Sequence, residues 1–291
     1  MEFTSVSISS GQIESTEALP IRYDLYAPQG ANDHPLPVVL FVHGFKGFKD
    51  WGIWPDACEE MARNGMVVCA INLSRNGIGE HKYEFDRLDL FEKQTLSQDL
   101  NDIGRVIEAL QNGEIADEHA HMNTDLIGIL GHSRGGHTAV TAGVEFDHIQ
   151  AVVNWNAVAD YLARWSKNMI SDWETKGYTH IMNSRTGQKM KLDRVVYDDS
   201  KEHADRVIAI RRVEELRVPT LFIASREDES VPYTDSEKLH IACSAHDKEL
   251  RLLAHGGHTL GASHPYEDPE FPEPFAEALE WTSGWFREFL K

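Results

Sequence analysis

A serine flanked by glycines lies where a strand is expected to turn into a helix. Residues 131–135 read Gly-His-Ser-Arg-Gly, and they follow an apolar run that ends near Leu130. Glycines on both sides remove Cβ atoms where the strand and the helix crowd each other, so the serine can take a strained backbone that points its hydroxyl outward. We therefore predict that Ser133 is a nucleophile at the start of a helix.

A serine hydroxyl is a weak nucleophile, so it needs a base and a group that orients the base. Asp228 follows the apolar run 220–224, where its carboxylate could reach the same edge of a sheet. Glu227 and Glu229 in the same acidic loop are rivals by residue type. The Val-Pro pair at 231–232 suits a rigid turn after the aspartate, so Asp228 is the predicted orienting group.

The predicted base is His258, which follows the last expected strand, 250–253. Two glycines precede this histidine and free the loop to bring its imidazole over Ser133. The chain has 15 histidines, so a histidine alone carries little information. His255 and His264 remain alternatives in the same segment.

A second glycine-bearing turn offers a place for negative charge on a carbonyl oxygen. Residues 43–47 read His-Gly-Phe-Lys-Gly and follow the apolar run 38–42. We expect the backbone N–H groups of Phe45 and Arg134 to donate to the developing oxyanion. His43 is expected to hold this loop rather than to act as a base.

Strands and helices are expected to alternate along most of the chain. Buried strands are indicated at 38–42, 67–73, 126–130, 151–154, 220–224 and 250–253, and helices at 54–64, 94–110, after Ser133, at 234–244 and from 274 onward. The stretches 3–9 and 21–26 suggest an antiparallel pair at the start. The pattern predicts an α/β fold with a mostly parallel sheet of about eight strands, helices on both faces and sites at the carboxyl ends of the strands.

The stretch 157–213 interrupts this alternation. It contains no convincing strand, and we interpret it as a helical cap insertion in a core domain formed by 1–156 and 214–291. Arg185 in the insertion is a candidate ligand for a substrate carboxylate, with a surface salt bridge as the alternative. The following aromatic residues are candidates to line a pocket, with helix packing as the alternative: Trp155, Tyr161, Trp165 and Trp173.

Composition excludes several classes of protein. The chain has 291 residues, 41% of them hydrophobic, and its formal net charge of −19 opposes binding to nucleic acid. No apolar run approaches the roughly 20 residues that cross a bilayer, and the N-terminus lacks a secretory pattern, so we expect a cytoplasmic protein with no membrane partner. The three cysteines have no metal or redox spacing and are expected to be buried free thiols.

The combined motifs resemble those of serine α/β-hydrolases, whose nucleophile, acid and base also follow one another in the order Ser, Asp, His. The chain most resembles bacterial esterases related to dienelactone hydrolase, although that enzyme usually carries Cys where this chain has Ser133. The serine also argues against haloalkane dehalogenases and epoxide hydrolases, which need Asp there. The resemblance implies an α/β-hydrolase fold that covers nearly the whole chain apart from the insertion.

The same resemblance implies a carboxylesterase that cleaves a small-molecule ester through an acyl-enzyme, with no cofactor and no metal. A peptidase, an amidase or an acyltransferase would use identical machinery. A non-catalytic binding module of this fold usually lacks one member of the triad, and none is missing here.

Overall fold

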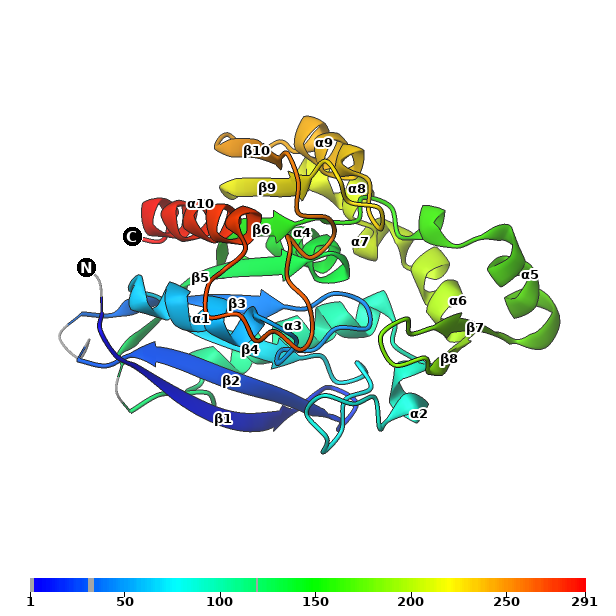
Figure 1. Ribbon diagram of the computed structural model, residues 1–291, viewed down its shortest axis with the longest axis horizontal. Coiled ribbons are helices and arrows are strands. Elements are labelled where there is room, and N and C mark those ends of the chain that lie inside the picture. The colour runs from blue at the N-terminus through cyan, green and yellow to red at the C-terminus, as the bar shows by residue number, and fades with distance from the viewer. Residues whose placement is uncertain (1–2, 31–33, 119) are drawn as a thin grey trace.

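The computed structural model describes residues 3–30, 34–118 and 120–291. Within them an eight-stranded sheet has the order β1-β2-β4-β3-β5-β6-β9-β10 (Figure 1). Strand β2 is antiparallel to β1 and β4, and the other pairs are parallel, as predicted. The strands are β1 (Val6–Glu14), β2 (Pro20–Pro28), β3 (Leu36–Val42), β4 (Val67–Asn72), β5 (Met122–His132), β6 (Ile149–Trp155), β9 (Thr220–Ser225) and β10 (Lys248–Leu253).

Strand β1 extends five residues beyond its expected end at Ser9, to Glu14. The extension was not predicted because most of its residues are polar. An edge strand with one solvated face tolerates polar side chains, and the hydroxyl of Ser10 donates to Asp24 of β2 at 2.6 Å.

Helices cover both faces of the sheet, and each buried strand contributes to both cores. Val38, Leu40 and Val42 of β3 face one hydrophobic cluster, whereas Val39 and Phe41 face the other. This alternation explains why the strand is a continuous apolar run. The helices outside the insertion are α1 (Trp54–Arg63), α2 (Leu88–Phe91), α3 (Leu96–Gln111), α4 (Arg134–Glu145), α9 (Tyr233–Ala242) and α10 (Glu273–Phe289). None of the helices in the described residues has the length and hydropathy needed to cross a bilayer.

The segment between β6 and β9 projects from one end of the molecule, away from both termini (Figure 1). It contains a hairpin of two strands, β7 and β8, so the expectation that no strand occurs there is wrong. Met190 and Leu192 are buried and alternate with Lys189 and Lys191, a period-2 pattern that the sequence analysis overlooked because it spans only five residues. Its elements are η1 (Leu162–Arg164), α5 (Lys167–Lys176), β7 (Tyr178–Met182), β8 (Lys189–Asp193), α6 (Val195–Glu202), α7 (Ala204–Val207), α8 (Ala209–Arg212) and η2 (Val213–Glu215).

The hairpin has a small core of its own, which it shares with loops of the sheet. Trp173 of α5 donates from Nε1 to the carbonyl of Leu192 at 3.0 Å. Trp173, Met190 and Leu192 form a cluster with Phe48 and Phe91, which belong to the segments after β3 and β4. The turn of the hairpin is thereby held close to the loop that follows β3.

Two glycines let helix α4 begin directly at the end of β5. A Cβ on Gly135 would lie 2.1 Å from the carbonyl oxygen of Val42, and one on Gly131 would lie 2.1 Å from the carbonyl oxygen of Gly135. Real Cβ atoms essentially never come within 3.0 Å of such atoms. Backbone packing therefore requires the glycines that the sequence pattern indicated.

The substitution Gly135→Ala should lower the free energy of unfolding by about 3 kcal/mol, because backbone atoms of β3 cannot move aside cheaply. Gly284→Ala in α10 is the matched control, since nothing lies within 4 Å of the added carbon and alanine favours a helix by up to about 1 kcal/mol. Urea denaturation of both variants measures the difference. Equal midpoints would contradict this account of the turn.

His137 of α4 connects the helix to the segment between β6 and β9. Its Nδ1 and Nε2 each lie 2.8 Å from a carbonyl oxygen, of Val158 and Val207 respectively. Burial lowers the pKa of His137 to about 4, and the charge of Arg134 acts in the same direction. The folded ring is therefore neutral at physiological pH and donates to one carbonyl at a time.

Below about pH 6.5, His137 is protonated in the unfolded chain but stays neutral in the folded protein. The free energy of unfolding therefore decreases as the pH falls toward 4. His137→Gln keeps a donor but removes this titration. The stability advantage of the wild type over the variant should shrink by about 2 kcal/mol between about pH 7.5 and about pH 5. Urea unfolding at both pH values measures it, and an unchanged difference would show that His137 does not titrate in this way.

Candidate active site

Ser133 occupies a strained turn at the carboxyl end of β5. Its φ is 57° and its ψ is −114°, a backbone conformation that residues other than glycine rarely adopt. Its backbone N–H donates to the carbonyl of Trp155 at 2.8 Å. Such strain costs on the order of 1–3 kcal/mol and persists because the surrounding backbone contacts fix the turn.

The structure brings the three predicted residues together although they are distant along the chain. The Nδ1 of His258 lies 2.7 Å from Oδ2 of Asp228, and its Nε2 lies 3.0 Å from Oγ of Ser133. A carboxylate accepts but cannot donate, so the ring places its N–H on Nδ1 and leaves Nε2 as an acceptor for the serine hydroxyl. This arrangement can withdraw a proton from Ser133.

The loop around Asp228 fixes the direction of its carboxylate. Oδ1 accepts hydrogen bonds from the amides of Ser230 and Val231, both at 2.8 Å, which leaves Oδ2 for the imidazole. Glu227 and Glu229, the rivals by residue type, are exposed to solvent. The turn after β9 therefore selects the aspartate among three adjacent acids.

The alternative histidines have other partners. The Nδ1 of His264 accepts from the amide of Gly52 at 2.7 Å, and Nε2 of His255 lies 3.5 Å from a carboxylate oxygen of Glu273. His258 is the one of the three that contacts the serine.

The loop after β3 lies directly against the serine turn. A Cβ on Gly44 would be 3.1 Å from Cβ of Ser133, so glycine allows this close approach. The amides of Phe45 and Arg134, the predicted donors, meet no acceptor among the described residues. They are thus available to a carbonyl oxygen bound at Ser133.

His43 is buried beneath this loop and holds it, as expected. Its Nδ1 lies 2.9 Å from the carbonyl oxygen of Gly44, and its Nε2 accepts from the amide of Leu73 at 3.4 Å. Burial lowers the pKa of His43 to about 4, so the ring stays neutral.

The side chain of Arg134 anchors the start of α4 through a contact that the sequence analysis missed. Its Nε lies 2.7 Å from Oδ2 of Asp99 in α3, and both side chains are almost fully buried. The guanidinium also lies between the rings of Phe45 and Tyr161, 5.7 and 5.1 Å from their centroids. The ion pair fixes Arg134, which directly follows Ser133.

A pocket of about 240 Å³ opens beside the serine. Its lining combines the loop after β3, the serine turn, the histidine loop and the turn of the β7–β8 hairpin. The main side chains are those of Phe45, Lys46, Trp51, Ser133, Arg185 and His258. Among the described residues, no group of three or more His, Cys, Asp or Glu side chains is arranged to hold a metal ion.

The four aromatic residues predicted for the pocket do not line it. Trp155 is fully buried on the α10 side of the sheet, where its Nε1 donates to Oγ1 of Thr282 at 2.9 Å. Tyr161 and Trp173 each pack edge to face against Trp165. The packing alternative therefore holds for all four.

Aromatic side chains from another segment line the pocket instead: Phe45, Trp51 and Trp54. The sequence analysis missed them as pocket residues. Their position directly after the carboxyl end of β3, the edge where sites of parallel sheets lie, is the signal that could have indicated them.

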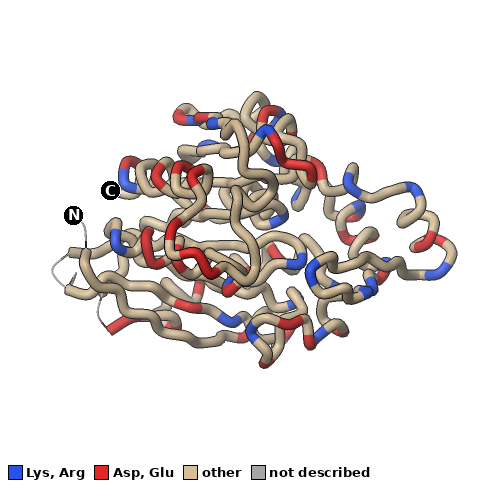
Figure 2. The backbone as a smooth tube through the Cα atoms, in the orientation of Figure 1, with Lys and Arg blue, Asp and Glu red and all other residues tan. Residues whose placement is uncertain are grey.

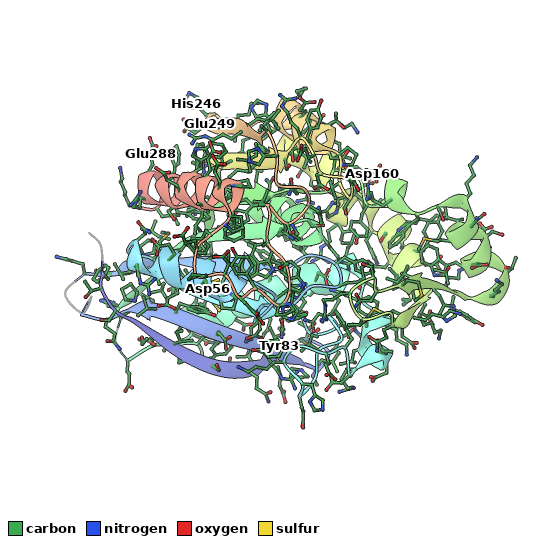
Figure 3. All side chains as sticks on the ribbon, in the orientation of Figure 1. Asp56, Tyr83, Asp160, His246, Glu249 and Glu288 are labelled. Atoms are coloured by element: carbon green, nitrogen blue, oxygen red, sulfur yellow. The ribbon has the colours of Figure 1, made fainter. Side chains whose placement is uncertain are left out.

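Arg185 lines the pocket, and a carboxylate partner for it is not found among the described residues. Its guanidinium donates to the carbonyl of Tyr83 at 3.2 Å and lies 5.9 Å from the ring centroid of Phe48. Figure 3 labels Tyr83, at the edge of the molecule on the segment between β4 and α2. The salt-bridge alternative is therefore not what the structure shows.

A second cation, Lys46, faces the same space and was not predicted. Its Nζ lies 3.5 Å from the carbonyl oxygen of Met182, and burial lowers its pKa. Figure 2 shows further lysines and arginines on the hairpin, in a chain whose net charge is −19. The lining of the pocket thus contains two cations and, among the described residues, no Asp or Glu.

Comparison with solved structures shows a shared fold. A dienelactone hydrolase from Anabaena variabilis has a TM-score of 0.62 at 17% identity, with 98% of this chain and 99% of that chain covered. An esterase domain from Rhodothermus marinus has a TM-score of 0.65 at 17% identity, with 98% and 100% covered. An acylaminoacyl peptidase from Pyrococcus horikoshii has a TM-score of 0.71 at 16% identity, with 99% of this chain and 42% of that chain covered.

These similarities confirm the predicted α/β-hydrolase fold. A search of the curated proteins finds no significant match. The family model of the prolyl oligopeptidase family matches residues 58–287, which include all three members of the Ser133–Asp228–His258 arrangement. The chain is therefore a hydrolase that belongs to the prolyl oligopeptidase family.

Proposed function

We propose that the protein hydrolyses carboxylic esters through an acyl-enzyme on Ser133. The observation that carries this proposal is the continuous chain of contacts from the serine hydroxyl through His258 to Asp228, at 3.0 and 2.7 Å. A nucleophile, its base and the orienter of the base within hydrogen-bond reach are what acyl transfer requires.

The proposed reaction has two steps. His258 takes the proton from Ser133, whose oxygen attacks the ester carbonyl, while the amides of Phe45 and Arg134 stabilise the oxyanion. The protonated ring then gives its proton to the leaving alcohol. A water activated by the same histidine releases the acid and restores the serine.

The size of the pocket supports a small ester rather than a long peptide. At about 240 Å³ it is below the usual range of roughly 300–1,000 Å³ for ligand pockets, and the hairpin turn closes one side of it. We propose that the insertion 157–213 serves as a cap in this way. The net charge of −19 supports a substrate other than nucleic acid. The cytoplasmic location stays a prediction.

The family match supports peptide cleavage as the second candidate, because the family takes its name from an oligopeptidase. Faster hydrolysis of aminoacyl anilides than of short nitrophenyl esters would favour it. Transfer of the acyl group to an added alcohol, rather than to water, would instead indicate an acyltransferase.

Ser133→Ala should abolish labelling by a fluorophosphonate probe and lower ester turnover by at least about 1,000-fold, because the attacking oxygen is lost. Gel fluorescence and nitrophenyl ester hydrolysis measure the two effects. Ser166→Ala, which removes a serine hydroxyl from the N-cap of helix α5 in the insertion, is the matched control because Ser133 is likewise the N-cap of α4. Labelling that survives in Ser133→Ala would refute the proposal.

We also propose that Arg185 and Lys46 bind a carboxylate on the substrate. Arg185→Ala should lower kcat/KM about tenfold for an ester that carries a free carboxylate and leave its neutral counterpart unchanged, since one charge-assisted hydrogen bond is worth about 1.5–3 kcal/mol. Lys189→Ala, on the same hairpin but outside the pocket lining, should affect neither ester. An equal loss on both esters would contradict charge recognition.

A further inference from the structure

Asn156 lies directly after β6 in a backbone conformation that asparagine tolerates better than most residues. It is buried, and its φ is 48°. Its Nδ2 donates to the carbonyl of His258 at 2.8 Å and lies 3.3 Å from that of Gly257. Its Oδ1 accepts from the amide of Ser225 at 2.8 Å. One side chain thus spans the loops that carry the base and the orienting acid.

A second donor reaches the same carbonyl oxygen. The Nε2 of His132 lies 2.8 Å from the carbonyl of His258, and the two imidazole rings are 4.8 Å apart between centroids. Burial lowers the pKa of His132 to about 3, so its ring is neutral at physiological pH and donates one N–H. The carbonyl of His258 is therefore held from two sides.

The backbone around Asn156 also contacts the other two loops of the site. The carbonyl of Trp155 accepts from the amide of Ser133 at 2.8 Å, and the amide of Asn156 donates to Ile223 at 2.8 Å. Ser225, which Asn156 binds, in turn accepts from the amide of Asp228 at 3.2 Å. Residues 155 and 156 thus connect the nucleophile, the acid and the base.

The histidine loop needs such an anchor because its own backbone is permissive. Gly256 and Gly257, just before His258, have φ values of 115° and 61°. A displacement of the imidazole by about 1 Å would weaken its contact with Ser133, and errors of that size cost on the order of 100-fold in rate.

We propose that Asn156 is a positioning residue that, together with His132, fixes the His258 imidazole for proton transfer from Ser133. The inference rests on the proposed function and adds to it the group that aligns its base. The side chain of Asn156 does not reach the serine itself, so its effect passes through the loop that carries His258.

Two substitutions at Asn156 test this role. Asn156→Gly removes the side chain and tolerates the positive φ, and Asn156→Asp keeps an oxygen for Ser225 but replaces the donor to His258 with a second oxygen. Both should lower the rate of fluorophosphonate labelling, and kcat per labelled site, by about 10- to 100-fold while KM changes less than about threefold. Counting labelled sites separates slow chemistry from loss of folded protein.

Asn154→Ala is the matched control. Asn154 is buried in β6, two residues before Asn156, and neither polar atom of its side chain meets a partner among the described residues. This variant should label at the wild-type rate per folded site. His132→Gln keeps a donor and should retain most of the rate, whereas His132→Phe should lose it as the Asn156 variants do.

The outcomes separate this inference from the proposed function. If the wild type itself fails to label at Ser133, the proposed function is wrong. If it labels and the Asn156 variants label equally fast per site, only the positioning role is overturned. If Asn156→Gly yields no folded protein, the labelling rates of Asn156→Asp, His132→Gln and His132→Phe test the positioning role in the same assay.

Discussion

The site depends on how closely the start of helix α4 approaches strand β3. Gly131 and Gly135 permit this approach, since a side chain on Gly135 would overlap the carbonyl of Val42. The close packing forces Ser133 into its positive φ and presents its hydroxyl at the end of β5. It also brings the loop after β3 beside the serine, so one backbone contact places both the proposed nucleophile and the proposed oxyanion donors.

The proposed base, His258, is positioned by a different kind of interaction. Nothing in the sheet register places His258, because its loop begins beyond β10 and contains two glycines with positive φ. Its position results from hydrogen bonds: Asp228 on the ring, and Asn156 and His132 on the carbonyl. The serine side of the site is thus positioned by backbone packing and the histidine side by polar contacts.

The segment between β6 and β9 adds side chains of its own to the lining of the pocket. Its hairpin packs on loops of the sheet through Trp173, Met190 and Leu192, and this packing brings Arg185 to the pocket. Lys46 reaches the same space from the loop after β3. Two cations thus line the pocket of a chain whose net charge is −19, and salt screens water-exposed charges that lie farther away than about 8 Å.

Local patterns predicted most of the strands and helices around the central sheet. The alternation of apolar runs and helices predicted the parallel sheet, and glycines around Ser133 indicated the turn, because these features depend on residues that are close together in the sequence. They were insufficient where polar residues form structure, as in the second half of β1, and where a strand is very short, as in β8. In both places tertiary packing buries one face that composition alone does not mark.

The sequence by itself determined which residue types could attack, accept a proton and orient the base, since these depend on functional groups and on their order along the chain. Only the tertiary structure decided that Asp228 rather than its neighbours contacts the imidazole, that Trp155 belongs to the core, and that Asn156 holds the histidine loop. The physical reason is that hydrogen bonds and burial depend on distances between segments far apart in the chain, and no local pattern encodes those distances.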